Sequence, residues 1–193
     1  VKPHFLANDP GYDPSPRGRY LLFVGRLSPE KGAHVLLEAW KHLPDIPLKI
    51  IGDGPLMADA QAMLAAYPDL PIELCGRVPR EGVYDALRGA YALVVPSSCY
   101  ETFGLSIIEA FAIGTPVIAA GHGAPAELVE DGITGKHFIP NDAQSLAEQV
   151  RWLWDRPAQI SPMGAAGRAA YEARYTMARN YEMLMAIYAG AQG

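Results

Sequence analysis

Cysteine, basic charge and long hydrophobic runs are all scarce in this sequence. Its two cysteines, Cys75 and Cys99, lack metal-binding spacing, and each lies beside an apolar run. This pattern favours buried reduced thiols and a cytosolic compartment over a disulfide. No apolar run approaches the ~18 residues that a membrane span requires. Acidic residues (21) outnumber basic ones (16), giving a net charge of −5. That balance argues against non-specific nucleic-acid binding, which needs a broad basic surface.

The two commonest phosphate-binding fingerprints are also missing. The loop from Gly25 to Gly32, after the first apolar run, has neither the Walker A spacing nor Gly-x-Gly-x-x-Gly. A P-loop NTPase and a NAD-binding domain therefore lose support. The acidic composition still permits a small anionic ligand, because a few local cations are enough to hold a phosphate.

What the sequence does contain is a regular alternation of short apolar runs and helical patterns. Continuous apolar runs are typical of parallel strands buried on both faces. We expect strands at 20–24, 48–51, 72–75, 92–95, 116–119 and 135–138. Helical spacing predicts helices at 33–43, 56–67, 81–90, from 102–104 onward, at 126–130, at 145–153, and over 163–189, the last broken into two. This order predicts an α/β fold, a three-layer α/β/α, Rossmann-like, doubly wound parallel sheet.

One domain is expected to account for most of the chain. Residues 1–19 are rich in Pro and Gly and are interpreted as a linker or crossing segment from a missing N-terminal domain. Residues 20–193 show no internal repeat and no second core, so they predict a single domain that ends in C-terminal helices. In such sheets, ligands bind in the crevice beyond the carboxyl ends of the strands.

Two cations follow the first predicted strand at this edge of the sheet. Arg26 and Lys31 stand one and six residues beyond Gly25 and close to a helix N-terminus. Such an arrangement suits a diphosphate, because guanidinium, ammonium and helix N–H groups all attract anions. From spacing alone, two solvated loop charges remain an equally good interpretation.

Two carboxylates bracket the junction between the fourth strand and its helix. Glu101 and Glu109 are separated by seven residues, and Phe103-Gly104 leads into a helix whose first N–H groups belong to Leu105 and Ser106. Glutamates at this spacing also occur by chance, so spacing alone does not show that the pair is functional. Its place at a junction between a strand and a helix is what favours a binding role. A carboxylate at the loop tip can accept hydrogen bonds from sugar hydroxyls, and one on the helix can accept them from the cis-diol of a ribose. Sugar, diphosphate and ribose would then follow one another along the crevice.

These motifs resemble, in order, the C-terminal donor-binding domain of a retaining family 4 (group 1) glycosyltransferase with the GT-B fold. The resemblance covers about residues 20–155. It rests on Gly25-Arg26-Leu27 with Lys31-Gly32, Gly52-Asp53-Gly54-Pro55, Gly76-Arg77-Val78, the Glu-x7-Glu signature from Glu101 to Glu109, Gly114-Thr115-Pro116, and Glu127-Leu128-Val129-x-Asp131-Gly132-x-x-Gly135. The family therefore implies a nucleotide-sugar site at the crevice.

The resemblance also implies a role for each matching residue. Arg26, Lys31 and Glu101 would be the catalytic residues, with the two cations on the donor diphosphate and Glu101 on the transferred sugar. The implied donor-binding residues are Gly25, Arg77, Val78, Thr102, Phe103, Gly104, Leu105, Ser106 and Glu109. Glu109 would take the ribose, and Arg77 and Val78 would lie against the base. No metal or other cofactor is implied, because the cations and the helix dipole replace one.

The implied activity is transfer of a hexosyl group, with retained configuration, from a UDP-, GDP- or ADP-linked sugar to a lipid, glycan or small-molecule acceptor. The fragment alone is expected to be inactive, because the missing N-terminal domain would complete the site. We expect a cytoplasmic protein, no nucleic-acid partner, and membrane contact only through the missing half. Two alternatives stay open: a stand-alone, non-catalytic nucleotide-sugar-binding module, and a GT-B-like nucleotide-sugar epimerase.

Overall fold

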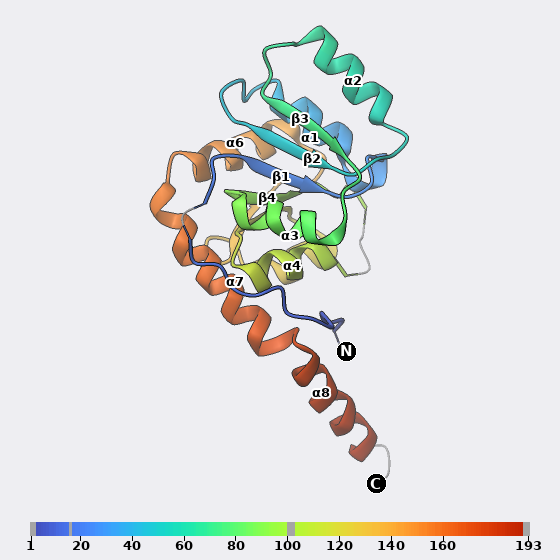
Figure 1. Cartoon of the computed structure of the whole chain (residues 1–193), viewed down its shortest axis with the longest axis vertical. Coiled ribbons are helices and arrows are strands. Elements are labelled where there is room, and N and C mark those ends of the chain that lie inside the picture. Colours follow the sequence, from blue (N-terminus) through green and yellow to red (C-terminus); the bar gives the residue numbers. More distant parts are fainter. Residues whose placement is uncertain (1–2, 16, 100–102, 191–193) are drawn as a thin grey trace.

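The computed structural model describes residues 3–15, 17–99 and 103–190, and it confirms the predicted α/β fold (Figure 1). Six parallel strands form one sheet in the order β3-β2-β1-β4-β5-β6. The strands are β1 (Leu21–Val24), β2 (Leu48–Ile51), β3 (Ile72–Gly76), β4 (Ala92–Val95), β5 (Val117–Ala120) and β6 (Gly135–Phe138). Each lies within one residue of its predicted position.

Helices connect successive strands and cover both faces of the sheet. They are η1 (Pro29–Lys31), α1 (Ala33–Trp40), α2 (Met57–Ala66), α3 (Arg80–Gly89), α4 (Leu105–Ile113), α5 (Gly123–Leu128), α6 (Ala143–Trp154), η2 (Pro157–Gln159), α7 (Ile160–Arg174) and α8 (Met177–Gly190). The predicted break in the last helical stretch is confirmed. Helix α5 lies earlier than expected, at 123–128 instead of 126–130, because Pro125 fits the first turn, where its missing N–H is not needed.

Side chains alternate between two hydrophobic clusters, one on each face of the sheet. Leu21 and Phe23 of β1 face a cluster that includes Trp40 of α1 and Leu146 of α6. Leu22, between them, faces the other cluster, which α3, α4 and α7 cover. Because successive strand residues point to opposite faces, a run without polar residues supplies both clusters. Burial on both faces explains why apolar and polar residues do not alternate along most of the predicted strands.

Helices α4 and α7 pack together through two glycines. A Cβ atom on Gly164 would lie 2.1 Å from the carbonyl oxygen of Gly114, and one on Gly167 would lie 2.9 Å from the ring of Phe111. Neither position has room for a side chain. The close approach of α7 to the end of α4 therefore depends on glycine at both sites.

Gly164→Ala is expected to lower the free energy of unfolding by about 1–3 kcal/mol, the usual cost of overpacking. The added methyl group meets a backbone carbonyl, which cannot move away cheaply. Gly190→Ala is the matched control, because a Cβ there has nothing within 4 Å. It should be neutral or slightly stabilising, since alanine favours helix. Urea unfolding of both variants checks the difference, and equal stabilities would contradict the packing argument.

Three carbonyl groups in the last turn of α3 accept hydrogen bonds from side chains of other segments. The Tyr20 hydroxyl donates to Ala86 O (2.8 Å), Thr115 Oγ1 to Leu87 O (2.8 Å) and Arg17 Nη1 to Arg88 O (2.7 Å). Helix C-termini leave such carbonyls without intrahelical partners, and burying them unpaired is costly. These three bonds fix the orientation of α3 on the sheet.

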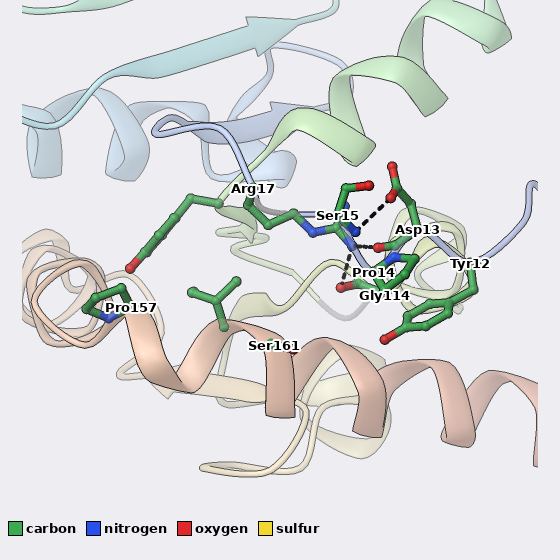
Figure 2. A pocket seen from close by; sticks show the side chains of 10 residues that line it. Tyr12, Asp13, Pro14, Ser15, Arg17, Gly114, Pro157 and Ser161 are labelled. Carbon is green, nitrogen blue, oxygen red and sulfur yellow. Dashed lines mark hydrogen bonds between the residues drawn. The ribbon is translucent and has the colours of Figure 1, made fainter.

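Arg17 also closes the end of α4, at the edge of the sheet where the strands begin. Its Nη2 donates to the carbonyl oxygens of Asp13, Ile113 and Gly114 (2.6, 3.1 and 2.9 Å). Figure 2 shows the end of the Arg17 side chain between Asp13 and Gly114, with dashed lines to both. A hollow of about 420 Å³ lies here, lined by residues 12–15, Arg17, Gly114 and the start of α7, among others. Its lining backbone is held by Arg17.

The N-terminal segment, predicted as a linker, packs on the domain at several described residues. Leu6 is buried, and its N–H donates to Tyr175 O (3.1 Å). Asp9 receives two hydrogen bonds from Arg168 of α7 (2.8 and 2.7 Å). Helix α8 extends away from the sheet beside this segment (Figure 1). Its exposed large apolar side chains are Met177, Tyr181, Met185, Ile187 and Tyr188.

The structure also shows how exposed the two cysteines are and whether any helix could span a membrane. The expectation of two buried thiols is wrong for Cys99, which is exposed because it lies on the loop beyond β4 and not in the strand; Cys75 is half-buried, and both are free thiols. Among the described residues, no helix is long and apolar enough to cross a membrane.

Candidate functional site

The strand order identifies where a ligand crevice must lie. Connections from β1 run outward through β2 to β3, whereas β4, β5 and β6 lie on the other side of β1. The winding therefore reverses between β1 and β4. At such a switch point the loops after the two strands leave in opposite directions, and a crevice opens between them. The loops concerned here are 25–32 and 96–104, which hold most of the predicted site residues.

These two loops interlock. Gly32 has a left-handed backbone (φ 69°), and a Cβ on it would lie 1.7 Å from Pro96 O, so only glycine fits. The N–H of Ser98 donates to Glu30 O (3.0 Å). The loop carrying Arg26 and Lys31 is thus held against the loop that leads from β4 to α4. This contact gives the cations a defined position relative to α4.

Two adjoining hollows occupy this edge of the sheet and share Gly25. The larger, about 610 Å³, is lined by Gly25, Arg26, Asp53, Arg77 and the glycines and proline around Asp53. The smaller, about 60 Å³, lies between β1 and β4 and is lined by Gly25, Lys31, Ser97 and Ser106, among others. The structure therefore brings together predicted residues from three separate segments: the 25–32 loop, Arg77 after β3 and Ser106 at the start of α4.

Helix α4 begins at this crevice. Gly104 is its N-cap, with a left-handed backbone (φ 85°) that lets the chain turn sharply into the helix. The first N–H groups of a helix have no intrahelical partner and carry partial positive charge. Leu105 and Ser106 supply them here, and Ser106 also lines the smaller hollow. Glu101, predicted for the sugar, and Thr102, predicted for donor binding, lie outside the described residues.

The Phe103 side chain has a structural role in addition to any backbone contact. Its ring packs against His4, with ring centroids 4.9 Å apart, and against Tyr175, 6.2 Å apart. It thereby joins the start of α4 to the N-terminal segment and to the end of α7. Sequence spacing could not reveal this packing, since the three residues are far apart in the chain.

The predicted base-contact loop follows β3. Arg77 is exposed, and its Nε lies 3.6 Å from a carboxylate oxygen of Asp53, which follows β2. Val78 is half-buried and packs on the cluster covered by α3 and α4. An exposed arginine over a hollow can lie flat against a planar ring, whereas Val78 is held by the core. The two residues therefore differ in how freely they could meet a ligand.

Glu109 is mostly buried, and it has an ionic partner. Its side chain is 16% exposed, and Oε1 accepts a hydrogen bond from Arg80 Nη2 at 3.0 Å. Burial raises the pKa of the Glu109 carboxyl above its usual range, while Arg80 opposes that rise. Sequence analysis missed Arg80, because nothing local links it to a residue 29 positions away on another helix.

Within the residues that the structure describes, no three His, Cys, Asp or Glu side chains gather in a way that could hold a metal ion. Among the described residues, the charged groups that line the two hollows are Arg26, Lys31, Asp53 and Arg77, and the Arg80–Glu109 pair joins α3 to α4. Such a set can hold phosphates at its centre and accept hydrogen bonds from hydroxyl groups at the carboxylates.

The sequence model of the family described as glycosyl transferases group 1 matches residues 9–170. The chain belongs to this family. It is 35% identical over 160 residues to the D-rhamnosyltransferase WbpZ of Pseudomonas aeruginosa, covering 82% of this chain and 42% of that protein. The chain spans less than half the length of the curated relatives it matches, at 42%, 44% and 46% for three of them.

Solved structures show the same fold. Anabaena Alr3699/HepE, in complex with UDP-glucose, superposes with a TM-score of 0.79 at 22% identity over 89% of this chain and 49% of that one. The C-terminal domain of the group 1 protein LpcC of Francisella tularensis gives a TM-score of 0.72 at 23% identity, covering 83% of this chain and 88% of that one. The sheet and its helices therefore match the domains of GT-B glycosyltransferases.

Proposed function

We propose that this chain is the donor-binding domain of a retaining, family 4 glycosyltransferase that transfers a hexosyl group from a nucleotide-diphosphate sugar. One observation carries the proposal. The loop with Arg26 and Lys31 is locked against the loop that opens α4, and both border hollows that meet at Gly25. Two cations and a helix N-terminus around one crevice form a diphosphate site. The UDP-glucose held by Alr3699/HepE, which shares the fold, supports the choice of donor.

Each part of the donor has an assigned contact. Arg26, Lys31 and the N–H groups of Leu105 and Ser106 bind the diphosphate and stabilise the charge that develops on the leaving nucleotide. No metal ion is needed for that step in this proposal, because the cations supply the positive charge. The remaining contacts are Glu101 with Thr102, Phe103 and Gly104 on the sugar, Glu109 on the ribose, and Arg77 and Val78 on the base.

The rest of the reaction belongs to a second domain. In this proposal residues 1–19 cross from an N-terminal domain, which supplies the acceptor pocket, and residues 20–193 form the C-terminal half of the enzyme. The isolated chain binds donor but transfers no sugar. The parent works in the cytoplasm, and any membrane contact is made by the other half. The short span of this chain relative to its curated relatives supports this division.

Isothermal titration calorimetry of this chain with UDP-, GDP- and ADP-sugars tests the donor site. One nucleotide family should bind, and its nucleoside diphosphate should compete with it. If none of the three binds at millimolar concentration, the chain has no preformed donor site. Assaying the full-length enzyme for glycosyl transfer and for epimerised donor then separates a transferase from an epimerase, and no turnover by either route would favour a binding module.

The two glutamates should affect different parts of the donor. Glu109→Ala is expected to weaken nucleoside diphosphate and nucleotide sugar alike by about 10- to 100-fold, because it removes charge-assisted hydrogen bonds to the ribose worth about 1.5–3 kcal/mol. Glu101→Ala should weaken only the sugar-bearing donor. Calorimetry with UDP and UDP-glucose, or the matching GDP and ADP pairs, measures both effects. Equal losses of diphosphate affinity would contradict the division of roles.

A further inference from the structure

Arg80, Tyr84 and Glu109 form a hydrogen-bonded cluster that joins α3 to α4. Arg80 Nη2 donates to Glu109 Oε1 at 3.0 Å, and Arg80 Nε donates to the Tyr84 hydroxyl at 2.6 Å. The guanidinium carbon also lies 5.4 Å from the centre of the Tyr84 ring. Arg80 is therefore held at two points, by its own helix and by α4.

The position of Arg80 is unfavourable for its own helix. It is the first residue of α3, where the positive end of the helix dipole disfavours a cation. Its side chain is 62% exposed, so burial of its own stem explains little. Glu109, in contrast, is 16% exposed and needs a partner for its charge, since an unpaired buried carboxylate is costly. Arg80 is therefore best explained as the ionic partner of Glu109 on α4.

The hydrogen bond from Arg80 leaves most of the Glu109 carboxylate available. An ionised carboxylate has two oxygens with about four acceptor positions. Arg80 donates to Oε1 and the Tyr84 hydroxyl also interacts with the carboxylate, so about two of the four positions can still accept hydroxyl groups. A cis-diol needs two acceptors at a fixed spacing, and a carboxylate held at one oxygen presents them without losing rotational freedom on binding.

We propose that Arg80, held by Tyr84, is a positioning residue that fixes the Glu109 carboxylate and balances its negative charge so that it can take the ribose hydroxyls of the donor. This inference rests on the proposed function, in which Glu109 contacts the ribose. It adds a residue that lies outside the family motifs and acts only through Glu109.

Arg80 should also set the pH at which ribose binding is lost. Among the described residues, the groups that act on Glu109 are Arg80 and Tyr84, both from α3. Burial raises the pKa of Glu109 and the bonds from these two residues lower it. Removing Arg80 therefore raises the Glu109 pKa further, so the carboxylate protonates at a higher pH. Ribose-dependent affinity should then begin to fall at a higher pH during acidification.

The experiment compares diphosphates with and without ribose hydroxyls. UDP, GDP and ADP are titrated into the chain by calorimetry, each beside its 2′,3′-dideoxy counterpart. For the base that binds, the wild-type protein should prefer the ribose form by about 10-fold or more. Arg80→Gln should reduce that preference to about 3-fold or less. Because both ligands carry the same phosphates, which titrate near pH 6, their ratio between pH 5 and 8 reports Glu109 alone.

Three controls separate positioning from general damage. Arg151→Gln removes an arginine paired with Asp45 on the surface and should leave binding unchanged. In a Glu109→Gln background, Arg80→Gln should change affinity less than 2-fold, about the error of the measurement. Arg80→Lys keeps the charge but loses the planar fork, so it should restore the wild-type pH profile with only part of the ribose preference.

Failure of the proposed function and failure of the Arg80 inference would give different results. If the wild-type chain binds no diphosphate, the proposed function falls and this inference falls with it. If the wild type prefers ribose and Arg80→Gln keeps both the preference and the pH profile, only this inference is overturned. Equal weakening of ribose and dideoxy ligands would also overturn it, because Arg80 would then contact the phosphates or the base directly.

Discussion

Replacing Arg26 and Lys31 together by alanine is expected to weaken nucleoside diphosphate binding at least about 100-fold. Each charge-assisted hydrogen bond to a phosphate contributes about 1.5–3 kcal/mol, and each 1.4 kcal/mol corresponds to a tenfold change in affinity. The two side chains belong to one loop, which Gly32 holds against Pro96. Calorimetry with the diphosphate of the base that binds measures the loss, and the residual binding should depend less on salt.

The matching nucleoside and a charge-matched variant provide the controls. A nucleoside without phosphates should bind the double variant as weakly as it binds the wild type, because neither cation contacts it. Lys41→Ala with Arg156→Ala removes the same charge at residues that contact Glu38, Tyr67 and Trp152. That variant should bind the diphosphate normally. A comparable loss in the control would mean that net charge, and not the loop, determines affinity.

Arg17→Ala is expected to destabilise the domain by about 3 kcal/mol, although Arg17 lies at the edge of the sheet away from the crevice. Its guanidinium donates to four carbonyl oxygens, including those at the ends of α3 and α4. A hydrogen bond from a charged group contributes about 1.5–3 kcal/mol, and carbonyls left unpaired in the interior add to the loss. In thermal unfolding, this corresponds to a decrease in Tm of about 6–12 °C for a domain of this size.

Arg19→Ala is the natural comparison for that measurement. Arg19 is two residues away and exposed, and its guanidinium lies 4.7 Å from the ring centre of Trp154. Such a contact contributes about 0.5–1 kcal/mol. Arg17→Lys should fall between the two, because an ammonium keeps the charge but reaches fewer carbonyls than the planar guanidinium. Arg17 and Arg19 variants of equal stability would contradict the role assigned to Arg17.

Much of the fold could be predicted because the signals are local. Continuous apolar runs such as 92–95 and 117–120 indicate strands that are buried on both faces, and glycines follow several of them. Helix boundaries were less predictable, as α5 illustrates. Residue contacts across the chain were not predictable at all: the packing of Phe103 on His4 and Tyr175 involves three segments that have no shared sequence pattern.

The candidate site also has a part that could be predicted from the sequence and a part that could not. Arg26, Lys31, Ser106 and Glu109 were found from their positions after predicted strands and from the family motifs, and the structure brings the loop with Arg26 and Lys31 to the same edge of the sheet as Ser106 at the start of α4. Arg80 was missed, since its importance lies in a contact with another helix. A local anomaly, an arginine as the first residue of a helix, was the available signal, and it has meaning only once α3 is placed beside α4.

The sequence by itself determined the order of strands and helices, the loops that carry cations and carboxylates, and the family, because periodicity and motif spacing are properties of neighbouring residues. Only the tertiary structure decided that β1 lies next to β4, that the loop after β1 locks against Pro96, and that Arg80 pairs with Glu109. These depend on how segments distant in sequence pack around a shared core, where burial and close approach, not local pattern, select the partners.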